Sequence, residues 1–219
     1  RGSTVGIIGG TGSGKSTLIN LIPRFYDVTQ GSVEVDGRNV KDYSFKQLRK
    51  QIGIVPQQSI LFKGTIRDNM KWENPDLSDE DIITALKNAQ AYEFVSKLPM
   101  GLDSHVEQGG KNFSGGQRQR LCIARAIAAQ PKVLILDDSF SALDFATDAA
   151  LRKALSQYTH EMTVIIVTQR CSTIMNSDLI LVLDDGMLVG KGTHKELLKN
   201  CETYKEICLS QLSKSEVEV

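Results

Sequence analysis

The segment Gly9–Ser16 constrains the fold of this chain more than any other part of the sequence. It reads Gly-Gly-Thr-Gly-Ser-Gly-Lys-Ser, which fits the pattern Gly-x-x-x-x-Gly-Lys-Ser/Thr, and it lies between an apolar segment, Val5–Gly9, and a helical pattern, Ser16–Ile22. In this context the glycines let backbone N–H groups surround phosphate oxygens, and the start of the helix adds further donors. The sequence therefore predicts a phosphate-binding loop near the start of an α/β fold.

The residue types in this loop predict ATP and Mg²⁺ as its ligands. Lys15 is expected to reach the β- and γ-phosphates, and the Ser16 hydroxyl to ligate Mg²⁺. The predicted nucleotide-binding residues are Gly9, Gly10, Thr11, Gly12, Ser13, Gly14, Lys15, Ser16 and Thr17. The alternative is a glycine-rich turn with an incidental Lys-Ser pair, and the strand before it and the helix after it disfavour that alternative.

A second apolar segment, Val133–Asp137, ends in a carboxylate. Ligands of α/β sheets bind at the carboxyl ends of the strands, so Asp137 is expected to lie near the phosphate loop and to hold Mg²⁺ through water as a Walker B aspartate. An apolar strand that ends in Asp is common. The assignment therefore depends on the phosphate loop that precedes it in the chain.

The remaining pattern predicts a mostly parallel sheet with a helical insertion. Further strands are expected at Thr163–Thr168 and Leu179–Leu183, and the Asp36-Gly37 turn predicts a small antiparallel element. Helical signals dominate between about Lys63 and Gln130. We expect a core lobe at 1–62 and 131–200, a helical subdomain at 63–130, and a C-terminal helix and tail at 201–219.

Composition excludes some classes of function. Lys plus Arg and Asp plus Glu each number 26, so no net charge favours nucleic acid as a partner. No apolar run approaches the roughly 20 residues that span a bilayer, so any membrane association is expected to be indirect. The four cysteines show no metal-binding spacing and are expected to be reduced thiols. They are Cys122, Cys171, Cys201 and Cys208.

The segment Phe113–Arg120, Phe-Ser-Gly-Gly-Gln-Arg-Gln-Arg, resembles the LSGGQ signature of the ABC ATPase family, with Phe in the Leu position. Ser114 and the glycines after it are expected to open a helix and to form a second anion-binding N-terminus. An isolated Ser-Gly-Gly-Gln would more simply be a helix cap without a ligand, but its position just before the Walker B strand favours the signature. The resemblance implies catalytic roles for Ser114, Gly116 and Gln117.

The resemblance implies a P-loop NTPase (RecA-like) core that pairs head-to-tail with a second nucleotide-binding domain. Gln57 is similar to the Q-loop glutamine that contacts Mg²⁺, and Ser141–Asp144 to the D-loop. Leu61–Asn69 resembles the exporter branch, which places Phe62 and Trp72 near a transmembrane domain of the same polypeptide, although Phe62 could equally pack in the core. The implied function is ATP hydrolysis that drives multidrug efflux, at the cytoplasmic face of the cell membrane.

Two positions depart from the family pattern. Asp138 stands where the family usually has the Glu that polarises water, and Gln169 stands where it has a switch histidine. The shorter Asp could leave the water out of reach, although it could also serve as the base. Gln can donate to a γ-phosphate but cannot relay a proton. The chain therefore resembles the degenerate-site subunit of bacterial heterodimeric multidrug exporters, whose own site hydrolyses ATP slowly or not at all.

Three other functions stay open: an inactive nucleotide-gated clamp, half of a symmetric homodimeric ATPase, and a soluble ABC ATPase of DNA repair or translation. Neutral charge and the absence of heptad repeats disfavour the last. The family's adenine-stacking aromatic residue has no counterpart before Gly9, so the domain is expected to be N-terminally truncated. Tyr26 and Tyr43 are expected to be packing residues rather than substitutes for that aromatic.

Overall fold

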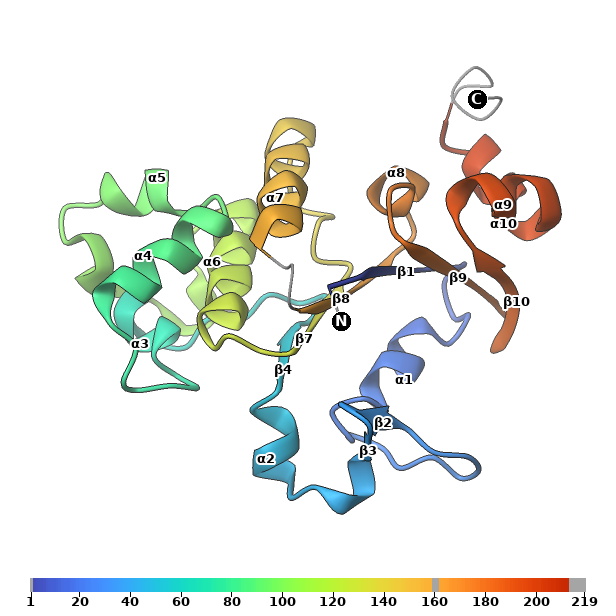
Figure 1. Ribbon diagram of the computed structural model, residues 1–219. Coiled ribbons are helices and arrows are strands. Elements are labelled where there is room, and N and C mark those ends of the chain that lie inside the picture. The colour runs from blue at the N-terminus through green and yellow to red at the C-terminus, as the bar shows by residue number, and fades with distance from the viewer. Residues whose placement is uncertain (1, 159–161, 213–219) are drawn as a thin grey trace.

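The computed structural model, which describes residues 2–158 and 162–212, contains a six-stranded sheet of strand order β10-β9-β1-β8-β7-β4 (Figure 1). All neighbouring strands are parallel except β9 and β10. The strands are β1 (Thr4–Ile8), β4 (Ile52–Val55), β7 (Val133–Asp137), β8 (Thr163–Thr168), β9 (Leu179–Asp184) and β10 (Met187–Gly192). The predicted α/β fold with a mostly parallel sheet is confirmed.

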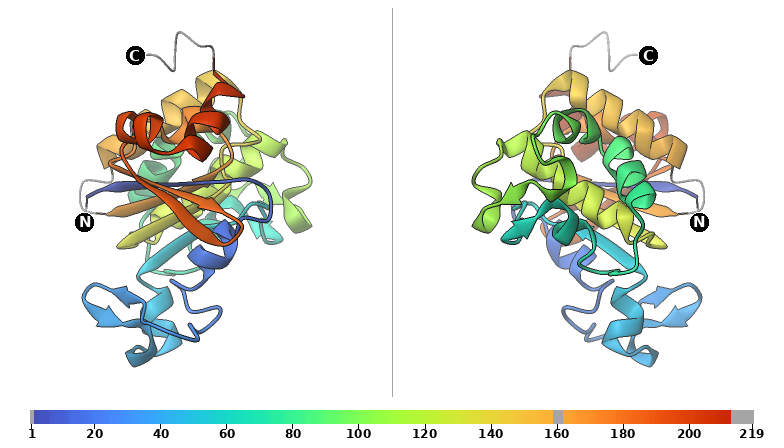
Figure 2. Two further views of the ribbon diagram at one scale, coloured as in Figure 1. Left: turned by 90° about the vertical axis from the view of Figure 1, so that its right-hand side faces the viewer. Right: turned by 90° about the vertical axis from the view of Figure 1, so that its left-hand side faces the viewer.

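The sheet is covered on both faces, which explains why its central strands are apolar throughout. Successive residues of β7 alternate between the two cores: Leu134 and Leu136 belong to one buried cluster and Ile135 to the other. Helices α7 (Phe145–Tyr158), α8 (Cys171–Ile174), α9 (His194–Asn200) and α10 (Glu202–Leu209) lie on one side of the sheet (Figures 1 and 2). Helices α1 (Lys15–Asn20) and α2 (Phe45–Arg49) lie on the other.

The predicted antiparallel element is present as strands β2 (Glu34–Val35) and β3 (Arg38–Asn39). Asp36 and Gly37 form its turn with φ values of 55° and 73°, the left-handed backbone that tight hairpins need. A short 3₁₀ helix, η1 (Val40–Asp42), follows it.

A group of helices follows β4 in the chain and lies beside the sheet (Figure 1). It consists of α3 (Ile66–Met70), α4 (Asp79–Asn88), α5 (Tyr92–Ser96) and α6 (Gly115–Ala128), with 3₁₀ helices η2 (Gly101–Asp103) and η3 (Gln108–Gly110). Helix α6 packs against α4 and β4. Two short strands, β5 (Gly64–Thr65) and β6 (His105–Val106), also pair here. The helical signals that dominate this region in the sequence therefore did not reveal this pair of short strands.

Two helices begin with a capping box, in which a Ser or Thr is followed three residues later by an acidic residue. Ser78 and Asp81 form a capping box at α4, and Thr193 and Glu196 form another at α9. No helix of the described residues is long and apolar enough to cross a membrane. Residues 213–219, for which a tail was expected, lie outside the described part of the chain.

The cysteine prediction was wrong for two of the four residues. Cys171 at the start of α8 and Cys208 near the end of α10 form a disulfide, while Cys122 and Cys201 are buried free thiols. Spacing could not reveal the pair, because 37 residues separate its members. Only the packing of α10 beside α8 brings the two sulfurs together.

The buried sheet centre generates a test of the fold. Leu134 on β7 has no exposed surface, whereas Leu188 on β10 is 54% exposed. We expect Leu134→Ala to lower the free energy of unfolding by about 2–5 kcal/mol, because the substitution leaves a cavity and removes the packing contacts of the buried side chain. The matched control Leu188→Ala should stay within about 0.5 kcal/mol of the wild type. Urea denaturation measures both, and equal losses would contradict the described core.

Candidate functional site

The site is built where four neighbouring parallel strands end. Register pairs Ile8 of β1 with Thr168 of β8, and Asp137 of β7 with Val167 of β8. Val55 of β4 pairs with Leu136 of β7. The segments that follow these strand ends carry the phosphate loop, Gln169, Asp138 and Gln57. Candidate residues far apart in the sequence therefore meet at one edge of the sheet.

The phosphate loop needs glycine at particular positions. Gly12 and Gly14 have φ values of 83° and 90°, which a side chain would strain. A Cβ at Gly9 would lie 2.1 Å from the carbonyl oxygen of Leu183, so backbone packing forbids one there. Gly10 has open space instead. The loop is thus held against β9 at its start and opens to solvent further along.

Lys15 organises the loop from inside. Its ammonium donates to the carbonyl oxygens of Gly9 at 2.9 Å and Gly10 at 2.6 Å, and to Ser13 Oγ at 3.2 Å. Burial lowers the pKa of Lys15, and the nearby carboxylates of Asp137 and Asp138 partly offset this. The loop therefore wraps around a buried cation whose three bonds are all directed at phosphate-loop oxygens.

Ser16 and Asp137 form the second contact of the site. Ser16 Oγ donates to Asp137 Oδ2 at 3.0 Å. Burial raises the pKa of Asp137, while the bond from Ser16 acts in the opposite direction. A hydroxyl and a carboxylate side by side are the hard oxygen donors that Mg²⁺ prefers. Thr17 is exposed in the first turn of α1. The residues present thus fit Mg²⁺ and a nucleoside triphosphate.

Asp138 and Gln169 lie beside this centre. The Asp138 backbone is left-handed, with φ 46°, and its N–H donates to the carbonyl oxygen of Val167 at 2.8 Å. Gln169 Nε2 donates to Thr11 Oγ1 at 3.5 Å, a long bond that directs the amide at the phosphate loop. Gln57 is exposed two residues beyond β4. All three side chains therefore belong to the same edge of the sheet.

The signature residues form a separate part of the surface. Ser114 caps α6: its Oγ accepts from the Gln117 N–H at 3.2 Å, and Gln117 Oε1 accepts from the Ser114 N–H at 3.0 Å. Gly116 packs against the carbonyl oxygen of Ala142, where a Cβ would lie 3.3 Å away. Among the described residues, no hydrogen bond joins these residues to the phosphate loop.

Sequence reasoning missed two residues that shape the site. Ser139 is buried and donates to the carbonyl oxygen of Val55 at 3.0 Å, which ties the ends of β7 and β4 together. Gln211 Nε2 donates to the carbonyl oxygen of Gln169 at 2.7 Å and fixes the loop after β8. Ser139 directly follows two candidate carboxylates and could have been suspected. No sequence signal marks Gln211.

The two tyrosines considered for packing differ. Tyr43 donates from its hydroxyl to the carbonyl oxygen of Val35 at 2.9 Å and is partly buried, as expected. Tyr26 is 63% exposed, so the expectation that it packs was wrong. Tyr26 lies in the loop after α1.

Comparison with known proteins identifies the family of this chain. The family model described as ABC transporter matches residues 1–141, which include the phosphate loop, the signature segment and the Walker B strand. The chain belongs to the ABC transporter family. The resemblance to the ABC family read from the sequence is confirmed.

Several relatives cover nearly all of this ABC domain. An uncharacterized ABC transporter ATP-binding protein of Mycobacterium tuberculosis is 49% identical over 213 residues, which are 96% of this chain and 36% of that protein. A putative multidrug export ATP-binding/permease protein of Staphylococcus aureus is 44% identical over 207 residues, 94% of this chain and 36% of that protein. The chain therefore spans about 36% of the length of these relatives.

A solved structure has the same fold. The structure of a bacterial Atm1-family ABC exporter with ATP bound matches this ABC domain with a TM-score of 0.92 and 38% identity. The match covers 96% of this chain and 37% of the other. The predicted P-loop NTPase architecture is confirmed by this likeness.

Burial of Asp137 generates a pH-dependent prediction. Because its pKa is raised above 3.8 in the folded protein, an ionised Asp137 opposes folding above that raised pKa, and the cost disappears as the pH falls below 3.8. We expect Asp137→Asn to melt at a higher temperature than the wild type at pH 7, with the difference shrinking toward pH 4. Thermal melting across a pH series measures this, with Asp76→Asn on the surface as the control. A less stable Asp137→Asn at pH 7 would contradict the stated role of burial.

Proposed function

We propose that this chain is the ATP-binding motor domain of a membrane ABC exporter, and that it pairs head-to-tail with a second nucleotide-binding domain. The observation that carries this is the separation of two anion-binding elements in one chain. The phosphate loop lies with Asp137 at the sheet edge, whereas the signature opens α6 in the helical part. A single nucleotide held by Lys15 and Ser16 leaves the signature free to serve another site.

The exposed start of α6 suits a phosphate group supplied from outside the chain. Ser114 and Gly115 are exposed. The Ser114 hydroxyl satisfies the Gln117 N–H, and no protein acceptor for the N–H groups of Gly115 and Gly116 is found in residues 2–158 and 162–212. These donors and the positive end of a 14-residue helix favour an anion. The head-to-tail pairing of the family would supply one, namely the γ-phosphate held by the partner domain.

Within its own site, each residue has a defined task. The Lys15 ammonium, which donates to the carbonyl oxygens of Gly9 and Gly10, would bind phosphate oxygens of the nucleotide. The Ser16 hydroxyl would ligate Mg²⁺, and Asp137 would hold the ion through water. When bound, Mg²⁺ neutralises charge on the phosphates. Gln57, two residues beyond the end of β4, would supply a further oxygen to the metal. Gln169 donates its amide to the γ-phosphate from the position where its Nε2 already points at Thr11.

This site is proposed to be degenerate. The Asp138 N–H donates to the carbonyl oxygen of Val167 at 2.8 Å, which opposes a shift of this backbone that would make up for the methylene by which Asp is shorter than Glu. A reacting group misplaced by about 1 Å can cost about a hundredfold in rate. Gln169 cannot accept or relay a proton. We therefore infer slow or absent hydrolysis at this site and a heterodimer in which Ser114, Gly116 and Gln117 complete the competent site of a different subunit.

An exposed aromatic pair supports contact with a transmembrane domain, proposed to belong to the same polypeptide. Phe62 and Trp72 stack with ring centroids 4.2 Å apart, and they are 36% and 59% exposed. They border a cavity of about 190 Å³ whose lining includes Arg49 and Arg125. Multidrug efflux is proposed from the name of the Staphylococcus aureus relative. The domain would then lie at the cytoplasmic face of the cell membrane.

The division of the domain remains a proposal as well. Residues 1–62 and 131–200 would form the core lobe that binds nucleotide, residues 63–130 the helical subdomain that carries the signature, and residues 201–219 a C-terminal extension. An inactive nucleotide-gated clamp is the second candidate function, and the anchored Asp138 favours it over a symmetric homodimeric ATPase.

The role of the signature generates a test with a matched control. In the full transporter with its partner, Ser114→Ala should lower ATP turnover by about ten- to a hundredfold, the worth of one hydrogen bond to a charged phosphate. The same change removes the α6 cap, which costs about 0.5–2 kcal/mol of stability. Ser78→Ala removes the equivalent cap of α4 outside the site. Equal turnover losses in the two variants would show that only stability is affected.

The degenerate site generates a second test. We expect Asp138→Glu combined with Gln169→His to raise ATP turnover of the partnered transporter, because it restores the base and the proton relay of a second site. Turnover per transporter, measured with and without the partner, reports this. Rapid hydrolysis by the unpartnered wild type would contradict degeneracy and favour a symmetric homodimer. Turnover that stays absent with every partner would favour the clamp.

A further inference from the structure

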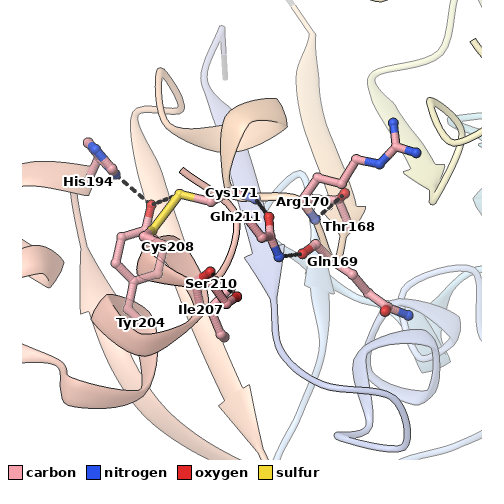
Figure 3. Close-up of a disulfide and its surroundings, with 10 residues drawn as sticks. All are labelled: Thr168, Gln169, Arg170, Cys171, His194, Tyr204, Ile207, Cys208, Ser210 and Gln211. Carbon is pink, nitrogen blue, oxygen red and sulfur yellow. Dashed lines mark hydrogen bonds between the residues drawn. A yellow bond between two sulfur atoms is a disulfide. The ribbon is translucent and has the colours of Figure 1, made fainter. Parts of the chain in front are cut away.

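The disulfide between Cys171 and Cys208 joins helix α8 to helix α10 (Figure 3). Both residues are fully buried, and their Cα atoms lie 5.6 Å apart, within the usual range for a disulfide. The bond closes a loop between residues that are 37 positions apart, from the start of α8 to the end of α10. It therefore fixes the C-terminal helices onto the sheet near the end of β8.

The disulfide lies next to the loop that carries Gln169. Cys171 lies two residues after Gln169, and Gln211 lies three residues after Cys208. The Gln211 amide bridges both segments: its Oε1 accepts from the Cys171 N–H at 2.9 Å, and its Nε2 donates to the Gln169 carbonyl at 2.7 Å (Figure 3). Gln169 Nε2 in turn donates to Thr11 Oγ1 of the phosphate loop. An uninterrupted series of contacts thus leads from the disulfide to the nucleotide site.

The surroundings of the disulfide can also accommodate two thiols. The Tyr204 hydroxyl lies 3.5 Å from Cys171 Sγ and 2.7 Å from His194 Nδ1 (Figure 3). A thiol at Cys171 would therefore keep a hydrogen-bonding partner after reduction. Tyr204 and His194 are oriented edge to face, with ring centroids 5.7 Å apart, which is a contact of the Tyr204 ring that does not depend on the S–S bond.

The same side chains could instead bind a metal ion. Cys171, His194 and Cys208 offer ligand atoms within 4.8 Å of one another. In the structure, however, the two sulfurs bond to each other and His194 Nδ1 is paired with Tyr204. Structural zinc sites use four ligands, and the described residues supply three of the usual kinds here. The disulfide is therefore the interpretation that the contacts favour.

We propose that Cys171 and Cys208 form a redox-modification site whose disulfide holds the Gln169 loop against the phosphate loop. The two thiols lose two protons and two electrons to a low-molecular-weight disulfide, which is released as two thiols, and a dithiol reverses the exchange. In a reducing compartment such a bond is transient and regulatory. The effect on nucleotide binding rests on the proposed function, whereas the exchange itself does not.

Oxidation should tighten nucleotide binding, because a loop fixed beforehand loses less freedom when ligand arrives. We expect the oxidised protein to bind methylanthraniloyl-ATP with Mg²⁺ between about twofold and tenfold more tightly than the reduced protein. It should also melt at a temperature roughly 10 °C higher, as expected for a disulfide that closes a loop of this length. Both sulfurs are buried, so exchange requires α10 to open and should be slower than at a surface cysteine.

The covalent part of the test needs no variant. The protein is equilibrated in buffers of reduced and oxidised glutathione, denatured, alkylated with N-ethylmaleimide and analysed by mass spectrometry. With four cysteines in the chain, the reduced protein should carry four alkyl groups. The oxidised protein should carry two, on Cys122 and Cys201, with one peptide pair joined through Cys171 and Cys208. Four alkyl groups in every buffer, or another pairing, would overturn the proposal.

Variants then test the consequence. Cys208→Ser should abolish the redox dependence of melting and of nucleotide binding, and the control Cys201→Ser should keep both. Redox dependence that persists in Cys208→Ser would contradict the proposal. Addition of ZnCl₂ to the reduced protein tests the alternative: stoichiometric binding that His194→Ala removes would replace the disulfide by a metal site. If ATP binds in neither redox state while alkylation still changes, the proposed function fails and the redox site stands.

Discussion

The parallel pairing of β1, β8, β7 and β4 is the constraint on which the rest of this domain depends. Because these strands run in one direction, their carboxyl ends lie at one edge of the sheet, and the residues that directly follow the strands lie at that edge too. Lys15, Asp137 and Gln169 meet for this reason, although more than 150 positions separate the first from the last. The buried hydrogen bond from the Ser139 hydroxyl to the carbonyl oxygen of Val55 also links the ends of β7 and β4.

Much of this arrangement could be predicted because it rests on strong local patterns. The bounds of β7 and β8 coincide with the predicted apolar runs, since a strand buried on both faces has few polar interruptions. The phosphate loop was predictable because its backbone needs positive φ values, as at Gly12 and Gly14, and glycine adopts these without strain. Helix α6 begins at Gly115 with Ser114 as its N-cap, where the Ser-Gly-Gly segment predicted a helix start.

The missed features are those that tertiary contacts create. Helix α2, helix α8 and strands β5 and β6 contain two to five residues each, too few for a hydrophobic period to be recognised. The Cys171–Cys208 bond and the contact of Gln211 with Gln169 depend on where α10 packs, which no spacing in the sequence encodes. Local sequence therefore predicted the loop and strand ends that are proposed to bind phosphate, but not the contacts of the Gln169 loop with α10 and with Gln211.

The two helix starts proposed to bind phosphate differ in their N-terminal caps, and the difference fits their proposed tasks. Helix α1 begins after Gly14 without a side-chain cap, so its first N–H groups lack the bond that usually contributes about 1 kcal/mol. Helix α6 begins after Ser114 with a complete capping box. In the proposed function, the uncapped start of α1 leaves its N–H donors for the nucleotide that Lys15 and Ser16 would hold. The capped start of α6 is ordered without a ligand, which suits a surface proposed to meet the nucleotide of a second domain.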